Sequence, residues 1–154
     1  MDSLTISVES PLADDLELLF QRHTADMHAD TPPESIHMLP RTALVTPDIT
    51  FLVGRLSGEP VAMGALKRLA PDHGELKSMH VLAEWRGRGL SRVMLNNLMG
   101  LAREQAISKV SLETGAQPGF VAARALYARA GFSECPAFPP YRPDPNSVFM
   151  TRML

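Results

Sequence analysis

Residues 75–91, with the sequence ELKSMHVLAEWRGRGLS, restrict the fold more than any other part of this chain. A run of strand length leads into the glycine-rich turn Arg86-Gly87-Arg88-Gly89, and a helix-like sequence follows. Glycines let consecutive backbone amides point the same way without a Cβ clash, and the first amides of a helix have no partner within it. Because the helix dipole also makes that end positive, the turn is suited to a phosphate or pyrophosphate. Arg92 adds another cationic side chain nearby.

Two common phosphate-binding motifs do not match this turn. A Walker A loop has Lys and then Ser or Thr after its last glycine, whereas Leu90 and Ser91 follow Gly89. A dinucleotide-binding G-x-G-x-x-G fingerprint would need a third glycine where Arg92 stands. That fingerprint also belongs to an early βαβ unit, whereas three predicted strands and a helix come first here.

The hydrophobic pattern along the chain predicts a mixed α/β arrangement. We expect amphipathic helices at residues 12–28, 90–105 and 120–130, and a short helical turn at 35–39. Strands are expected at residues 5–9, 50–56, 61–69, 75–81, 109–114 and 147–154, with a hairpin turn at 57–60. With 154 residues, 45% of them hydrophobic, and no visible linker, the chain is expected to form one domain, residues 1–154.

Composition and charge exclude several classes of protein. No apolar run could span a membrane, and the acidic N-terminus lacks the features of a secretory signal. The one cysteine, Cys135, cannot form an internal disulfide, so we expect a cytoplasmic protein. We expect no membrane partner. Residues 1–74 hold 11 acidic and 5 basic side chains, and residues 75–154 hold 6 and 10. This asymmetry fits either an anion site in the second half or two differently solvated surfaces, and charge alone favours the second explanation. A pI of about 6.2 argues against nucleic acid as a partner.

The glycine-rich turn and the sequence after it resemble the GCN5-related N-acetyltransferase (GNAT) family. In that family a strand ending in Val leads to a loop with the pattern Arg/Gln-x-x-Gly-x-Gly/Ala, and Val81 and residues 86–91 are similar to it. Downstream residues also lie at the family's spacing: Ala123, Leu126, Tyr127, Gly131 and Phe132. The chain departs from the pattern at Ser91 and at Phe120, where relatives carry an Asn that often contacts the cofactor arm.

The resemblance covers nearly the whole chain and implies the GNAT fold, of the mixed α/β (α+β) class. That fold has a central, mostly antiparallel sheet of six to seven strands, flanked by about four helices and splayed between two parallel central strands. Here those strands would be residues 75–81 and 109–114. More narrowly, residues 32–35, 111–115 and 144–150 resemble the bacterial YsnE-like branch.

The resemblance also implies acetyl-CoA as cosubstrate, held in the gap between the two parallel strands, with no metal. Its pantetheine arm would meet main-chain groups of one strand end, namely Met79, His80 and Val81. Its pyrophosphate would meet the turn and the helix start, namely Arg86, Gly87, Arg88, Gly89, Leu90, Ser91 and Arg92. His23 and His28, the nearest thing to a metal motif, are five residues apart and lie on different helix faces.

The implied reaction is N-acetylation by direct attack of an amine within a ternary complex. Tyr127 stands at the position of the usual acid, which protonates the leaving thiolate. The base stays open between Glu75 and Glu113, and His80 is a further titratable group that could instead face the other side of the sheet. Acceptor contacts are expected from two loops and one strand: Pro33, Glu34, Ser35, His37, Lys77, Tyr141, Arg142, Asn146 and Ser147.

We expect the acceptor to be the primary amine of a small molecule, with an amino-acid-like compound as one candidate. Glu34 could pair with the cationic amine, and Lys77 or Arg142 with a carboxylate. Two other functions remain open: acetylation of protein lysines or N-termini, and a CoA-binding regulatory domain without turnover. A homodimer is a further open expectation, because many members of the family pair.

Overall fold

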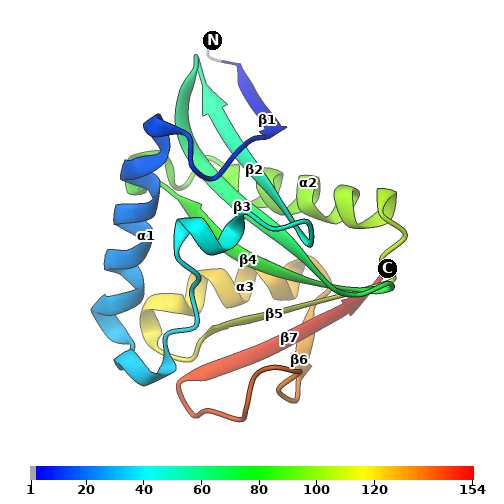
Figure 1. Ribbon diagram of the computed structural model, residues 1–154. Coiled ribbons are helices and arrows are strands. Elements are labelled where there is room, and N and C mark those ends of the chain that lie inside the picture. Colours follow the sequence, from blue (N-terminus) through cyan, green and yellow to red (C-terminus); the bar gives the residue numbers. More distant parts are fainter. Residues whose placement is uncertain (1–2) are drawn as a thin grey trace.

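The chain builds one seven-stranded sheet, which Figure 1 shows in the computed structural model covering residues 3–154. In chain order its strands are β1 (Leu4–Val8), β2 (Ile49–Leu56), β3 (Glu59–Ala70), β4 (His73–Val81), β5 (Lys109–Gly115), β6 (Ser133–Cys135) and β7 (Ser147–Met153). Across the sheet they lie in the order β1-β2-β3-β4-β5-β7-β6. The β4–β5 pair is parallel and the other pairs are antiparallel, which confirms the predicted mixed, mostly antiparallel sheet.

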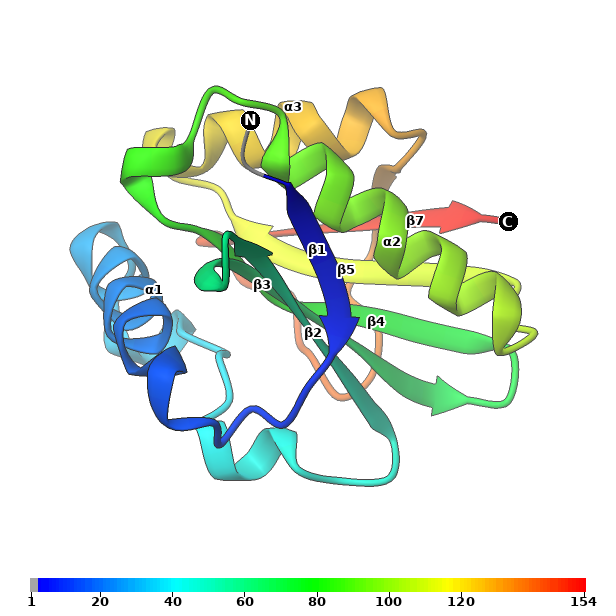
Figure 2. The ribbon, with the colours of Figure 1, turned by 90° about the horizontal axis from the view of Figure 1, so that it is seen from above.

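Helices cover both faces of this sheet and pack apolar side chains against it. As Figures 1 and 2 show, α1 (Glu17–Asp30) lies on one face, and α2 (Leu90–Glu104) and α3 (Val121–Arg129) lie on the other. The core on the α1 side includes Leu19, Phe20 and Phe51, and the core on the other side includes Met94 and Leu98. Within residues 3–154, no helix combines the length and hydropathy needed to cross a membrane.

The first helix begins later than its sequence pattern predicts. We expected it from residue 12, but α1 begins at Glu17 after a 3-10 turn at Asp14–Leu16. The Leu12 amide donates to Ser10 Oγ and the Ala13 amide to the Ser10 carbonyl, so this segment forms a turn rather than a first helical turn. Leu12 is accordingly 47% exposed instead of belonging to the buried stripe.

Short 3-10 turns replace the fourth helix that the resemblance implied. Three α-helices lie within residues 3–154, and the stretch between α1 and β2 forms 3-10 turns at Pro33–Ser35 and Arg41–Leu44. The first of these stands in place of the helical turn expected at residues 35–39. Prolines at positions 32, 33, 40 and 47 interrupt this stretch, and proline cannot continue a helical hydrogen-bond ladder. The third helix also starts one residue late, at Val121, because Phe120 is its N-cap.

The two parallel strands separate part of the way along their length. Their pairing runs from His73 opposite Lys109 to Leu76 opposite Leu112 and stops there. Both strands continue, β4 to Val81 and β5 to Gly115, without pairing with each other. The expected splay between residues 75–81 and 109–114 is therefore confirmed, and it opens the sheet at its centre.

Candidate active site

A cleft occupies the place where β4 and β5 separate. Its cavity volume is about 130 Å³. Both strands contribute to its walls, together with the end of α1, the loop that follows it, the start of α3 and the loop before β7. Its lining includes His23, Met27, Thr31, Ser35, Ile36, His37, Met38, Glu75, Lys77, Ser78, Met79, Glu113, Thr114, Phe120, Tyr127, Tyr141 and Asn146.

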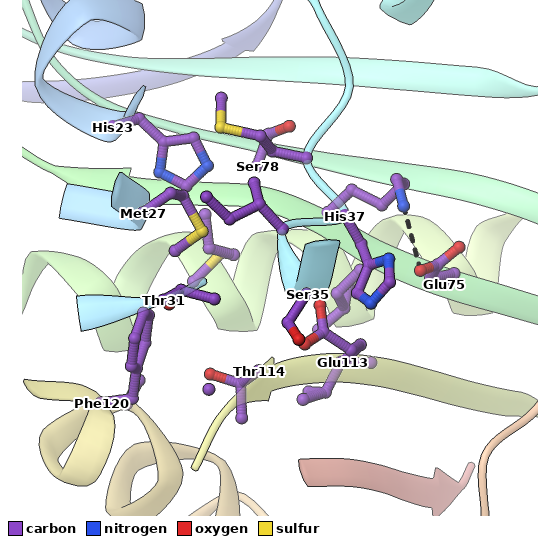
Figure 3. Close-up of a pocket in the computed structure, with 18 of the residues that line it drawn as sticks. His23, Met27, Thr31, Ser35, His37, Glu75, Ser78, Glu113, Thr114 and Phe120 are labelled. Atoms are coloured by element: carbon purple, nitrogen blue, oxygen red, sulfur yellow. Dashed lines mark hydrogen bonds and ion pairs between the residues drawn. The ribbon is translucent and has the colours of Figure 1, made fainter. Parts of the chain in front are cut away.

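The two ends of the cleft differ in chemistry, as Figure 3 shows. Met27 and Phe120 lie at one end, where side chains of α1 face the start of α3. Glu75 lies at the other end, and His37 and Glu113 lie next to each other between the two. The cleft can therefore bind a ligand with an apolar part and a charged or polar part.

A β-bulge shapes the β4 wall of the cleft. Between the paired residues Met63–His80 and Ala65–Lys77, β3 has one residue and β4 has two, Ser78 and Met79. Ser78 has φ of 55°, a left-handed conformation that is rare outside glycine. Bulges bend and twist a strand and leave a residue outside the regular ladder. The bulge thus accompanies the departure of β4 from β5 and leaves backbone groups there that can pair with a ligand.

Three side chains form a buried cluster at the charged end. Glu75 and Lys77 are two residues apart on β4, so they point to the same face of the sheet. Lys77 Nζ lies 3.1 Å from Glu75 Oε2 and 2.8 Å from Tyr141 Oη. The Tyr141 hydroxyl also donates to Glu75 Oε2, although 66 residues separate the two in sequence. Glu75 is only 1% exposed, so these donors compensate a carboxylate that burial would otherwise destabilise.

Glu113, on the β5 wall, faces the cleft opposite this cluster. Burial raises the pKa of its carboxyl, and nearby positive charge at His37 and Lys77 opposes that shift. The imidazole of His37 packs edge-on against the Tyr141 ring, with 5.2 Å between the ring centroids. His37 Nε2 is buried, and no residue in the range 3–154 forms a hydrogen bond with it.

Tyr127 enters the cleft from α3. Its ring packs edge-on against Phe132 at 5.9 Å between centroids, which explains the spacing of these two residues in the sequence. Burial raises the pKa of its phenol to about 12, so the hydroxyl keeps its proton at neutral pH. A protonated phenol in the cleft wall can serve as a proton donor.

Phe120 closes the apolar end over the last residue of β5. A Cβ built on Gly115 would lie 2.2 Å from the Phe120 ring, so this position requires glycine. The Arg124 guanidinium donates to the carbonyl oxygens of Gly115, at 2.6 Å, and Gln117, at 3.1 Å, and holds the connection between β5 and α3. A fixed aromatic ring therefore stands where relatives are expected to carry an amide side chain.

The glycine-rich turn lies at the N-terminus of α2. Gly87 and Gly89 both have φ of 78°, which confirms that the turn needs residues without a Cβ at these positions. The first helical bond is made by the Val93 amide to the Gly89 carbonyl, at 3.1 Å, so the preceding amides at the helix start have no helical partner. A Cβ at either glycine would meet no atom within 4 Å, so the space above the turn is open.

Arg86 and Arg88 are less available to bind an anion than the sequence suggested. Arg86 Nε donates to the Val81 carbonyl at 2.9 Å, and its other nitrogen binds Asp26 on α1 at 2.9 Å. The Arg88 guanidinium lies over the Trp85 ring, 4.7 Å from its centroid. Both side chains therefore contact the turn itself or α1, and the backbone amides of the turn are left facing open space.

The structure brings together many, but not all, of the side chains that the sequence suggested. Those that line the cleft are Ser35, His37, Glu75, Lys77, Met79, Glu113, Tyr127, Tyr141 and Asn146. Pro33, Glu34, Arg142 and Ser147 are not part of its lining, and the glycine-rich turn lies outside it. Sequence reasoning did not assign Met27, Thr31 and Met38 to a site. Met27 follows His23, also in the lining, by four residues on α1, a helical spacing that indicates one face but not what that face meets.

The side chain of His80 belongs to a separate cluster. Its ring packs against His23 at 5.3 Å between centroids, and its Nδ1 lies 3.9 Å from Asp26. Burial lowers the pKa of both imidazoles to about 4, so both are neutral near pH 7. His80 thus packs against α1, in keeping with the alternative that its side chain faces away from the gap.

Comparison with known proteins gives a consistent result. Residues 14–132 match the model of the "Acetyltransferase (GNAT) family". The chain is 40% identical over 136 residues to the N-acetyltransferase YsnE of Bacillus subtilis, covering 88% of this chain and 90% of that protein. It is 39% identical to a protein of Azospirillum brasilense named IAA acetyltransferase, over the full length of both.

A solved structure agrees with these relatives. A putative acyl-CoA N-acyltransferase from Klebsiella pneumoniae superposes with a TM-score of 0.81 and 31% sequence identity, covering 98% of this chain and 97% of that one.

Proposed function

The chain belongs to the acetyltransferase (GNAT) family and is an N-acetyltransferase, and from this premise we propose that it acetylates the primary amine of a small molecule. The amine attacks directly within a ternary complex of enzyme, acetyl-CoA and acceptor. In this proposal residues 1–154 form a single catalytic domain. One observation carries the choice of a small acceptor, namely the closure of the polar end of the cleft.

That end is bridged by contacts between segments far apart in the sequence. Asn146 Nδ2 donates to Ser35 Oγ at 3.3 Å, which joins the loop before β7 to the loop after α1. Tyr141, from the same late loop, is tied to Lys77 and Glu75 on β4. These ties narrow the polar end of the cleft, and a narrowed end supports a small molecule over an extended protein segment as the acceptor.

The residues present fit acetyl-CoA, which the family uses. The amides of Gly87–Arg92 lie at an open, left-handed turn and a helix N-terminus, a combination that suits a pyrophosphate. The bulged strand from Met79 to Val81 would hold the pantetheine arm in the manner of an added strand. The bound cosubstrate supplies the acetyl thioester. The main departure is Phe120, which offers the arm an apolar surface in place of an amide.

Side chains of the cleft account for the protons of the reaction. An acceptor that enters as an ammonium loses one proton to a base before attack and a second when the C–N bond forms. One proton is delivered to the sulfur as the C–S bond breaks. We assign that delivery to Tyr127, whose buried phenol is protonated at neutral pH. Glu113 would hold the ammonium at the cleft wall, and the fully engaged Glu75 would position Lys77 and Tyr141.

Lys77 gives the acceptor site a positive group beside the carboxylates. Its side chain is only 9% exposed and is held by Glu75 and Tyr141, so it presents a fixed donor to the cleft. An acceptor with a carboxylate or another hydrogen-bond acceptor near its amine would match this arrangement. This supports an amino-acid-like compound as one acceptor to test first.

Thiol release from acetyl-CoA across two sets of amines tests the proposal. One set contains small primary amines, namely lysine, spermidine, tryptamine and glucosamine. The other contains short peptides with a free N-terminus or an internal lysine. We expect release with at least one small amine and little with the peptides. Faster release with peptides would favour a protein acetyltransferase, and tight CoA binding without release in either set would favour a regulatory domain.

A further inference from the structure

His37 carries a buried nitrogen whose hydrogen-bonding capacity is unused. Its Nε2 has no partner among residues 3–154, although buried polar atoms are nearly always paired. The ring lines the cleft and lies beside Glu113, as Figure 3 shows. Its edge-on contact with Tyr141, at 5.2 Å, limits how the imidazole can turn. An unpaired atom held in a ligand cleft indicates that a bound molecule supplies the missing partner.

Two carboxyl groups interact with the charge of His37. Glu113 on β5 is attracted to it, and the pKa of Glu113 would be higher still without that attraction. The pKa of Asp144 is lowered by hydrogen bonds from Ser35 and the Asn146 amide, and also by the charge of His37. Tyr141 is the other titratable neighbour, and its hydroxyl is committed to Glu75. Lys77, a cation that lies over the Tyr141 ring, is paired with Glu75.

We propose that His37 is the proton acceptor that converts the bound ammonium of the acceptor to the nucleophilic amine. This inference rests on the proposed function and completes it by naming the base. The N–H bond of the ammonium breaks and its proton passes to His37 Nε2, leaving the electron pair on the acceptor nitrogen. Glu113 and Asp144 stabilise the imidazolium that forms, and the proton then leaves to solvent.

The other candidate bases in the cleft are less suited to this step. Glu75 is 1% exposed and its Oε2 already accepts from two donors, Lys77 and Tyr141. His80 is packed against His23 and faces α1. Glu113 is placed to stabilise the imidazolium of His37 rather than to act as the base itself, because opposite charges close together stabilise each other.

Two probe amines of equal size separate proton removal from acetyl transfer. Methylamine is protonated at neutral pH and needs a base, whereas hydroxylamine is largely free base and does not. In His37→Gln, we expect methylamine-dependent thiol release to fall by roughly 100-fold, the usual contribution of a general base. Hydroxylamine-dependent release, corrected for the uncatalysed reaction, should change far less. His28→Gln, at an exposed histidine of α1, is the matched control and should change neither rate.

Each outcome of this experiment is decisive. Equal losses with both amines, at unchanged acetyl-CoA affinity by calorimetry, would give His37 a structural role and overturn the inference. Full methylamine activity in His37→Gln would also overturn it, with the proposed function intact. A wild-type protein that releases thiol with neither amine nor with any member of the small-amine set would reject the proposed function itself.

Discussion

Lys77 Nζ lies 2.8 Å from Tyr141 Oη, and this contact joins the central strand β4 to the loop that precedes the last strand. Both groups also meet the carboxylate of Glu75. A cation, a phenol and a carboxylate thus share one buried site at the edge of the cleft. The arrangement fixes the late loop over the acceptor end, so its loss should affect both folding and acceptor binding.

The first prediction concerns this cluster. Lys77→Met leaves Glu75 without its cation inside the protein, and removing one partner of a buried ion pair costs about 3 kcal/mol of unfolding free energy. Urea unfolding would measure the loss. The double variant Glu75→Met, Lys77→Met removes both charges and should regain most of that stability. A single variant as stable as the wild type would contradict a buried, charge-paired Glu75.

The second prediction concerns the glycine-rich turn. Gly89→Glu places a negative charge and a strained left-handed side chain at the proposed pyrophosphate site, so acetyl-CoA binding should be lost in calorimetry. Gly100→Glu introduces the same side chain within α2, at a position where a Cβ meets no atom within 4 Å, and should bind normally. Wild-type affinity in a folded Gly89→Glu protein would refute this placement of the pyrophosphate.

The third prediction concerns Tyr127. Tyr127→Phe removes the proposed proton donor while keeping the ring that packs on Phe132. We expect kcat to fall by roughly 100-fold, as for loss of a general acid, with acetyl-CoA affinity and melting temperature nearly unchanged. Turnover at the wild-type rate would remove Tyr127 from the mechanism, and a parallel fall in melting temperature would point to packing instead.

The fourth prediction concerns Phe120 and the end of β5. Gly115→Ala forces a methyl group into the Phe120 ring, and overpacking of this kind costs about 2 kcal/mol. Phe120→Ala should make the alanine at position 115 tolerable, so the double variant should be less destabilised than the sum of the single ones. Additive losses in chemical unfolding would mean that the two residues do not compete for space.

The fifth prediction concerns pH. Folding lowers the pKa of His23 and His80 from 6.5 to about 4, so below pH 6.5 the unfolded chain binds more protons than the folded one. The contribution of these two groups to the free energy of unfolding is therefore complete above pH 6.5 and is lost as pH falls toward 4. In a variant with Gln at both positions, unfolding free energy should decline less over this range than in the wild type. Wild-type pH dependence in that variant would assign the decline to other groups.

The sequence was sufficient to predict features that depend on local spacing. The glycine-rich turn was predicted from residues 86–89, and Gly87 and Gly89 adopt the left-handed conformation that such a turn requires. The splay between the parallel strands was predicted from the family resemblance rather than from any pattern in the residues. The late start of α1 was missed because Ser10 accepts hydrogen bonds from the Leu12 and Ala13 amides and forms a turn there.

Contacts between distant segments could not be predicted in this way. Tyr141 reaches Glu75 across 66 residues through a proline-rich loop without periodicity, and Asn146 reaches Ser35 across 111. The bulge at Ser78 has no sequence signal, because its left-handed conformation falls on a residue that rarely adopts it. His37 could be named only as a loop residue near the acceptor, and its buried Nε2 became visible in three dimensions.

Transfer of a labelled acetyl group shows whether this protein acetylates small primary amines. The protein would be incubated with trideuteroacetyl-CoA and the small primary amines, and the products would be identified by mass spectrometry. We expect a trideuteroacetyl amide of at least one small amine, formed together with free CoA and absent when Gly89→Glu replaces the wild type. Bound but unreacted trideuteroacetyl-CoA with every amine would contradict it.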